Sequence, residues 1–233
     1  MPKRNVDLAR GEYYHIYNRG NSKQKIFRDK ADYDRFVKYL YLCNSNKNIN
    51  FRDNIVSSSI DAFSFERGQV LVSIGAWVLM PNHFHLYLSI SLTPGVGREE
   101  GEGGKNEITD FMHKLSSAYA KYFNEKYKRT GSLFEGRFKA VLVTKDNQAK
   151  YLFSYIHLNP IKLIQKDWKE KGVKSTPKAL EFLESYKWSS YLDYAGETRK
   201  ENLVLDRKNF LNYFGNVKEF KKDIFEWFSP HPA

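Results

Sequence analysis

The sequence is poor in cysteine and has no long apolar segment. Its single cysteine, Cys43, excludes a disulfide within the chain and a metal site built from several thiolates. The longest apolar run, residues 70–80, is far shorter than the ~20 residues of a membrane-spanning helix, and the opening residues MPKRNVD contain no apolar signal core. We therefore expect a cytoplasmic protein without a membrane partner.

Acidic residues are in the minority. The 27 Asp and Glu residues face 38 Lys and Arg residues, which gives a net charge of +11, and 16% of the residues are aromatic. Cations neutralise phosphates and aromatic rings stack on unpaired bases, so this composition favours single-stranded nucleic acid as a partner. A length of 233 residues suffices for one large domain, or for one domain with a smaller addition.

Two histidines two residues apart stand at the start of a strand-like run. His83 and His85 follow the turn residues Met80-Pro81-Asn82. Side chains alternate along a strand, so the two imidazoles share one face with Cβ atoms ~7 Å apart, and Phe84 faces the core. Such a pair can hold a divalent metal that takes a third ligand from elsewhere. Two partly buried strand histidines without a metal are the alternative interpretation.

The hydrophobic pattern of the first 160 residues alternates between strand and helix. It predicts strands, with Gly75 as a candidate bulge, over residues 12–18, 70–79, 83–90 and 138–144. It predicts helices over residues 29–44, 107–127 and 146–159. The order β-α-β-β-α-β plus a helix is that of an α+β, ferredoxin-like or RRM-like fold. We expect an antiparallel four-stranded sheet in the order 4-1-3-2, with the histidine strand in its centre.

The remaining segments are expected to be loops and a small helical addition. Residues 44–61 are polar and predict an insertion loop, and the glycine-rich residues 93–106 predict a mobile loop. The lysine-rich residues 166–178 predict a loop or solvated linker. Helical patterns recur at residues 180–186, 208–213 and 217–228. We divide the chain into a domain over residues 1–165 and a basic linker with a small helical C-terminal extension over residues 166–233.

A tyrosine and an asparagine four residues apart lie near the end of the last helix of the first domain. Residues at this spacing share a helix face, with Cβ atoms ~6 Å apart. Tyr155 can therefore present its hydroxyl to a metal-bound group, and the carboxamide oxygen of Asn159 can supply the third ligand. Pro160 ends the helix and leaves Asn159 in its last turn. Tyr151 lies on roughly the same face.

These motifs resemble the single-tyrosine HUH nucleases, and among them the REP-associated tyrosine transposases with an IS200-like transposase domain. The resemblance rests on HFH after Met-Pro-Asn and on YIHLNP about 70 residues later. It extends over about residues 10–195 and includes YHIYNRGN at 14–21, GSLFEGRF at 131–138 and WSSY at 188–191. In this family the tyrosine follows the histidines, whereas in conjugative relaxases it precedes them, so the order here argues against a relaxase.

The resemblance implies a metal-dependent DNA endonuclease and strand transferase with an added catalytic helix. His83, His85 and Asn159 would hold Mg²⁺ or Mn²⁺, and Tyr155 would form a 5′-phosphotyrosine and release a 3′ hydroxyl. The implied partner is single-stranded or hairpin DNA, so the protein would be nucleoid-associated when bound, as a monomer or a homodimer. Candidate phosphate contacts are Arg19, Arg137 and Lys139.

Two other function classes remain open. A non-catalytic RRM-like module, or a host-adopted derivative, would bind single-stranded nucleic acid without cleaving it. A metal hydrolase would need further histidine or carboxylate ligands at strand ends. Of the other histidines, His15 is interpreted as structural, and His157 either assists proton transfer or lies on the surface.

Overall fold

The computed structural model describes residues 6–90, 106–210 and 216–229. Most of the predicted loop over residues 93–106 lies outside these ranges. Within them, no helix combines the length and the apolar character that crossing a bilayer requires.

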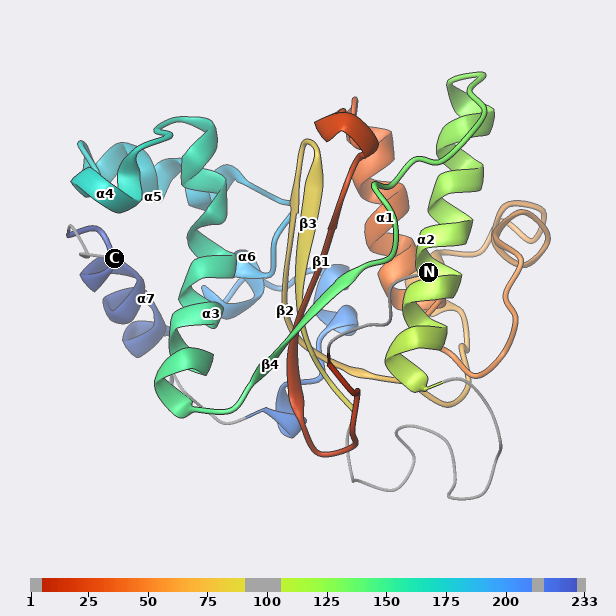
Figure 1. The fold of residues 1–233 in the computed structure, drawn as a ribbon, viewed down its shortest axis with the longest axis horizontal. Coiled ribbons are helices and arrows are strands. Elements are labelled where there is room, and N and C mark those ends of the chain that lie inside the picture. The colour runs from red at the N-terminus through yellow and green to blue at the C-terminus, as the bar shows by residue number, and fades with distance from the viewer. Residues whose placement is uncertain (1–5, 91–105, 211–215, 230–233) are drawn as a thin grey trace.

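A four-stranded antiparallel sheet forms the middle of the molecule (Figure 1). Its strands are β1 (Tyr13–Arg19), β2 (Ser73–Met80), β3 (His83–Ser89) and β4 (Lys139–Val143), in the order β2-β3-β1-β4. This confirms the predicted α+β class, strand order and central histidine strand. The register of β2 against β3 shifts between Ile74 and Ala76, which confirms the bulge at Gly75. A Cβ at Gly75 would lie 2.7 Å from the ring of Phe210, so a larger residue would require that ring to shift.

Seven α-helices lie in the described ranges. They are α1 (Lys30–Leu42), α2 (Glu107–Lys126), α3 (Asp146–Leu158), α4 (Trp168–Lys171), α5 (Thr176–Ser185), α6 (Tyr191–Tyr194) and α7 (Val217–Glu226). The predicted loop over residues 166–178 is therefore wrong in part, because α4 and the first turn of α5 fall within it. The predicted helix over 208–213 is only a 3-10 turn, Arg207–Asn209, as far as it is described. The polar insertion contains a π-helical turn, Arg52–Val56.

The two faces of the sheet are covered by different sets of helices. In Figure 1, α1 and α2 lie on one side of the sheet, and α3 with α4 to α7 lies on the other. Phe84 and Leu86 are fully buried in the core under α1 and α2, where burial of each side chain contributes ~1.5–3 kcal/mol. The neighbouring side chains of β3, His83 and His85, point to the α3 side, as the alternation predicted.

The C-terminal segment is built onto the sheet. The backbone N–H of Leu79 donates to the carbonyl of Trp188 and that of Ser190 donates to the carbonyl of Trp77, both at 2.9 Å. These contacts cover the outer edge of β2. Trp168 and Phe220 from the same segment share a hydrophobic core with Phe153 of α3. Residues beyond 165 thus help to fix the position of α3.

Candidate active site

His83 and His85 lie together on β3, as the sequence predicted. Their ring centroids are 5.0 Å apart and the rings are nearly perpendicular. His85 is 6% exposed, and His83 lies at the end of the strand, opposite Arg19 of β1. The two imidazoles therefore open toward the same space between the sheet and α3.

Each imidazole is oriented through its Nδ1 atom. The Nδ1 of His83 lies 2.6 Å from the Oδ1 of Asn82, and the Nδ1 of His85 lies 2.8 Å from the Nε2 of His15. An amide oxygen only accepts, so His83 donates from Nδ1 and keeps a lone pair on Nε2. The Nε2 of His85 has no partner in the described part of the chain. When Nδ1 of His85 donates to His15, its Nε2 likewise offers a lone pair, and such outer hydrogen bonds orient metal-binding histidines.

Burial keeps all three imidazoles neutral. It lowers the pKa of His15 to about 4. For His83, burial and the positive charges of Lys162 and Arg19 lower the pKa to about 4. The pKa of His85 falls well below its usual value, first through burial and then through the neighbouring histidines and lysines. Neutral imidazole is the form that binds metals.

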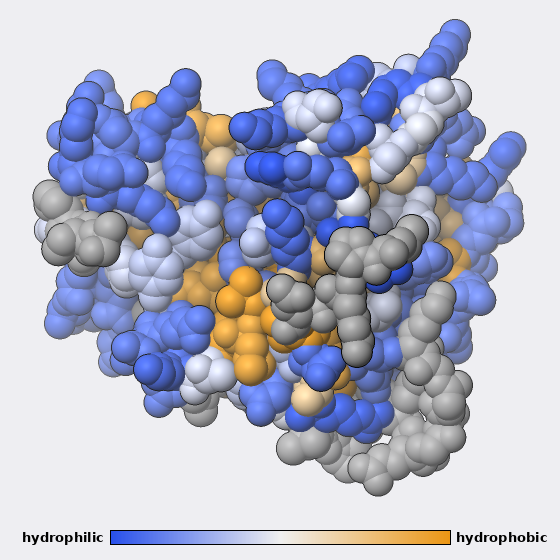
Figure 2. Space-filling model, viewed as in Figure 1, coloured by the Kyte–Doolittle hydropathy of each residue, from blue (hydrophilic) through white to orange (hydrophobic). Residues whose placement is uncertain are grey.

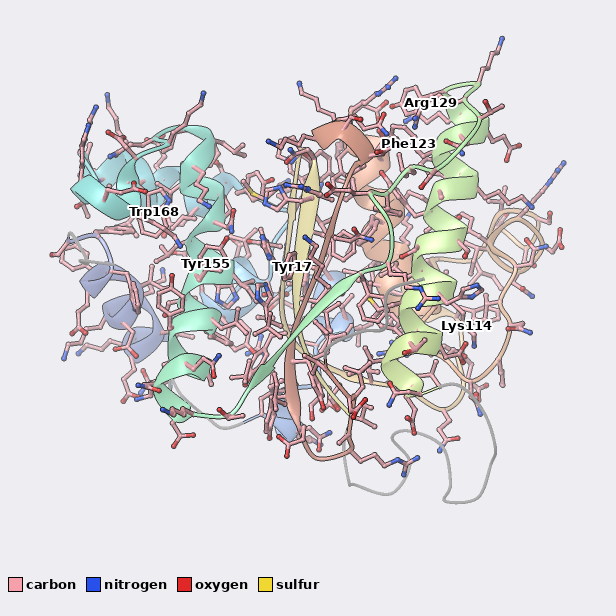
Figure 3. All side chains as sticks on the ribbon, viewed as in Figure 1. Tyr17, Lys114, Phe123, Arg129, Tyr155 and Trp168 are labelled. Carbon is pink, nitrogen blue, oxygen red and sulfur yellow. The ribbon has the colours of Figure 1, made fainter. Side chains whose placement is uncertain are left out.

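Tyr155 lies beside the histidines. Its ring centroid is 5.4 Å from that of His85 and 6.4 Å from that of His15. Figure 3 shows it on α3, at the height of Tyr17 on β1. The ring of Tyr151, one turn earlier, is parallel to that of Tyr155 at 6.2 Å and packs against Trp227. Tyr155 is therefore the tyrosine of this pair whose ring contacts His85.

Asn159 is fully buried immediately after α3. It begins a 3-10 turn, Asn159–Leu163, because Pro160 has no N–H to continue the α-helix. In the described residues neither its amide nitrogen nor its amide oxygen has a hydrogen-bond partner. Leaving a buried polar group without a hydrogen bond costs ~1–3 kcal/mol of stability. The unpaired amide oxygen of Asn159 is therefore free to act as a ligand. No group of three His, Cys, Asp or Glu suited to a metal occurs in the described ranges.

The three candidate phosphate contacts lie near β1 and differ in their interactions. The Nζ of Lys139 is 6.0 Å from the ring centroid of Tyr17, and that ring is 5.7 Å from His85. Arg19 forms a two-pronged ion pair with Glu135, in which Nη2 lies 2.7 Å from Oε1. It would have to exchange this partner to contact a phosphate. Arg137 is exposed just before β4.

An apolar patch interrupts this hydrophilic face. Figure 2 shows it between the lower part of α3 and β4. Among the exposed side chains of β4 is Val141, 42% exposed, which is paired with His15 in the sheet register and so shares its face. We call four side chains of β1 and β4 on this face the open strip. They are the imidazole of His15, the ring of Tyr17, the aliphatic Val141 and the cation Lys139.

Distant motifs of the sequence meet around this site. The segment at 131–138 pairs with the end of β1, where the N–H of Glu135 donates to the carbonyl of Arg19 at 3.0 Å. His157 is fully buried, and its Nε2 lies 2.8 Å from the Oγ of Ser190 in the WSSY segment. The surface interpretation of His157 is therefore wrong, because its ring connects α3 to the C-terminal segment.

Sequence reasoning missed two lysines beside Tyr155. The Nζ of Lys169 is 3.9 Å from the Tyr155 ring centroid, and that of Lys162 is 5.4 Å away. Lys162 lies in the 3-10 turn after α3, so helical spacing does not relate it to Tyr155. Lys169 lies on another helix, and no periodicity relates it to Tyr155. The role of His15 was also missed, because it depends on the strand register.

Comparisons with known proteins give low similarity. The solved structure of a REP-associated tyrosine transposase bound to a REP hairpin has 13% identity and a TM-score of 0.47, over 86% of this chain and 90% of that chain. A Deinococcus radiodurans protein assigned as a transposase has 17% identity and a TM-score of 0.31, over 65% and 93%. A bacterial tRNA(His) guanylyltransferase-like protein in complex with GTP has 9% identity and a TM-score of 0.41, over 72% and 74%.

No family model matches the chain, and no curated protein matches it.

Proposed function

We propose that this chain is a metal-dependent single-stranded DNA endonuclease and strand transferase with Tyr155 as its nucleophile. The observation that carries the proposal is the meeting of Tyr155 with the histidine pair, 5.4 Å between the rings of Tyr155 and His85. The sequence motifs that resemble REP-associated tyrosine transposases assign the same residues to the same roles.

The donor atoms fit a divalent metal. His83 and His85 offer neutral imidazoles oriented by Asn82 and His15, and Asn159 offers a buried amide oxygen without a partner. Two nitrogens and one neutral oxygen leave the cation its full charge for a phosphate, and Mg²⁺ or Mn²⁺ is the ion that the resemblance implies. When bound, the metal would offset charge on the scissile phosphate and orient it for in-line attack.

Tyr155 would carry out the bond exchange. Its phenolic oxygen attacks the phosphorus, so an O–P bond to tyrosine forms and the bond from phosphorus to the 3′ oxygen breaks. The phenol proton passes to solvent, and a proton from solvent completes the 3′ hydroxyl. The covalent link retains the phosphodiester, so attack by another 3′ hydroxyl rejoins strands and releases the tyrosine without ATP.

The open strip beside the site suits unpaired bases. Tyr17 and His15 are partly exposed aromatic rings on β1, and Lys139 lies on the neighbouring β4. Bases stack on such rings while cations contact the backbone phosphates. We therefore propose single-stranded DNA, free or at the foot of a hairpin, as the substrate class.

The test is a labelled pool of single-stranded hairpin DNA incubated with the protein and Mg²⁺ or Mn²⁺. We expect a metal-dependent covalent adduct with the wild-type protein, which Tyr155→Phe abolishes and Tyr151→Phe retains. Unfolding measurements on both variants exclude a loss of fold. A chelator should stop adduct formation in the wild type.

The other outcomes select the other function classes. Binding without an adduct across a diverse pool would indicate the RRM-like binding module. An adduct that survives Tyr155→Phe and is lost in Tyr151→Phe would support the proposed reaction and identify Tyr151 as the nucleophile. The metal hydrolase is the weaker alternative, because the further histidine or carboxylate ligands that it needs are not gathered in the described ranges.

A further inference from the structure

Lys169 lies close to the candidate nucleophile. Its Nζ lies 3.9 Å from the ring centroid of Tyr155 and donates to the hydroxyl of Tyr151 at 3.2 Å. The two tyrosine rings are parallel within 2°. One ammonium group therefore contacts both Tyr151 and Tyr155.

The backbone around Lys169 is anchored on both sides. The preceding residue, Trp168, is 3% exposed in the core that also contains α3. Gln165, before α4, donates from Nε2 to the carbonyl of Gly172, after α4, at 2.8 Å. The N–H of Val173 donates to the carbonyl of Phe228 at 2.8 Å. The backbone of Lys169 is thus placed by packing and hydrogen bonds of its own segment.

The nucleophile needs such a restraint. Tyr155 is only partly buried, and no hydrogen bond of its hydroxyl is among the described contacts that fix its ring. A cation over an aromatic ring is attracted by the negative face of the ring and so favours one ring position. Because attack requires close alignment, a displacement of about 1 Å costs about 10²-fold in rate.

We propose that Lys169 is a positioning residue that holds the Tyr155 ring in its orientation toward His85, so that the C-terminal segment completes the site. The proposal rests on the proposed function in so far as Tyr155 is the nucleophile. It also gives residues beyond 165 a role in the reaction and not only in stability.

The test compares Lys169→Met, Lys169→Arg and the matched control Lys171→Met. Methionine keeps most of the side-chain length and removes the charge, arginine restores it, and Lys171 lies on the same helix with 70% of its side chain exposed. We expect Lys169→Met to reduce the rate of adduct formation at saturating DNA about 10–100-fold. The half-saturating DNA concentration should change less than about twofold, with Lys169→Arg and Lys171→Met close to wild type.

A second readout does not require chemistry. 3-Fluorotyrosine at position 155 reports the ring environment by ¹⁹F NMR in the full chain without DNA. We expect one sharp resonance in the wild type and in Lys171→Met, and a shifted or broadened resonance in Lys169→Met. Thermal unfolding shows that each variant is folded.

The two readouts separate the two proposals. If the wild type forms no adduct, the proposed function fails, and the ¹⁹F spectra alone decide whether Lys169 positions the ring. Unchanged spectra and rates in Lys169→Met overturn the positioning role. A change confined to the half-saturating DNA concentration also overturns it, because Lys169 would then be a phosphate contact.

Discussion

The two faces of the sheet are made by alternate residues of the same strands, and they differ in chemistry. On β3, Phe84 and Leu86 are fully buried under α1 and α2, whereas His83 and His85 face α3. On β1, Tyr14 and Ile16 lie in the core under α1 and α2, whereas His15 and Tyr17 belong to the open strip beside Tyr155. A shift of one residue in either register would exchange the two sets.

The comparison shows how one face supports the other. The apolar face fixes the strand positions, and the strand positions place His15 against His85 and Arg19 against His83. Polar groups on the α3 side can then remain unpaired, as in Nε2 of His85 and the amide of Asn159. Both faces carry an apolar core, and the α3 face combines its core with these unpaired polar atoms.

The largest effect on stability is expected from the apolar face. Phe84→Ala should lower the free energy of unfolding by ~3–5 kcal/mol, because it removes a buried ring and leaves a cavity. Urea denaturation measures the change, and the folded fraction should still form adduct. A decrease in the free energy of unfolding of less than about 1 kcal/mol would contradict the inference that packing on this face stabilises the fold.

The neighbouring residue should give the opposite result. His85→Gln should reduce Mn²⁺ affinity more than about 100-fold, beyond the loss expected for an outer hydrogen-bond partner, and should cost less stability than Phe84→Ala. Titration calorimetry with Mn²⁺ measures the affinity. The control is His113→Gln, an exposed histidine of α2 on the other side of the sheet, which should bind metal as the wild type does.

His15 tests the support of the histidine pair. His15→Phe removes the partner of the His85 Nδ1 and keeps a ring of similar shape. We expect metal affinity and adduct rate to fall about 10–100-fold. His15→Gln retains an acceptor and should recover part of the loss. Equal values for His15→Phe and the wild type would leave His15 as a packing residue only.

The smallest effect is expected for Lys139, at the edge of the open strip on β4. Lys139→Met should weaken single-stranded DNA binding by a few-fold and reduce the slope of log affinity against log salt by about 1. The rate at saturating DNA should not change. Lys121→Met, an exposed lysine of α2 on the other side of the sheet, is the control. If both lysines change the slope equally, the DNA path is not confined to the α3 face.

The fold was predictable because its local signals agree. Alternation over residues 83–90 and helical spacing over residues 107–127 each set an element within one or two residues. The strand order followed from the order of elements. Helix α4 was missed because a single turn among lysines has no periodicity, and its stability comes from the burial of Trp168, a tertiary contact.

The site was predictable only where its parts are close in the sequence. His83 with His85 and Tyr155 with Asn159 are pairs whose spacing gives a shared face. The contacts of His15 with His85 and of Lys169 with Tyr155 depend on strand register and helix packing, which spacing does not encode. The Arg19–Glu135 ion pair is of the same kind, since it forms across 116 positions of sequence.

The contact of the WSSY segment with β2 also has a consequence for the timing of assembly. Ser190 bonds to Trp77 across 113 positions, and through His157 it also holds α3. At a synthesis rate of ~5–20 residues per second, these partners leave the ribosome roughly 6–23 s apart. His83, His85 and Tyr155 are thus made before the segment that contacts β2 and α3, so a nascent chain acquires these contacts only after the WSSY segment has left the ribosome.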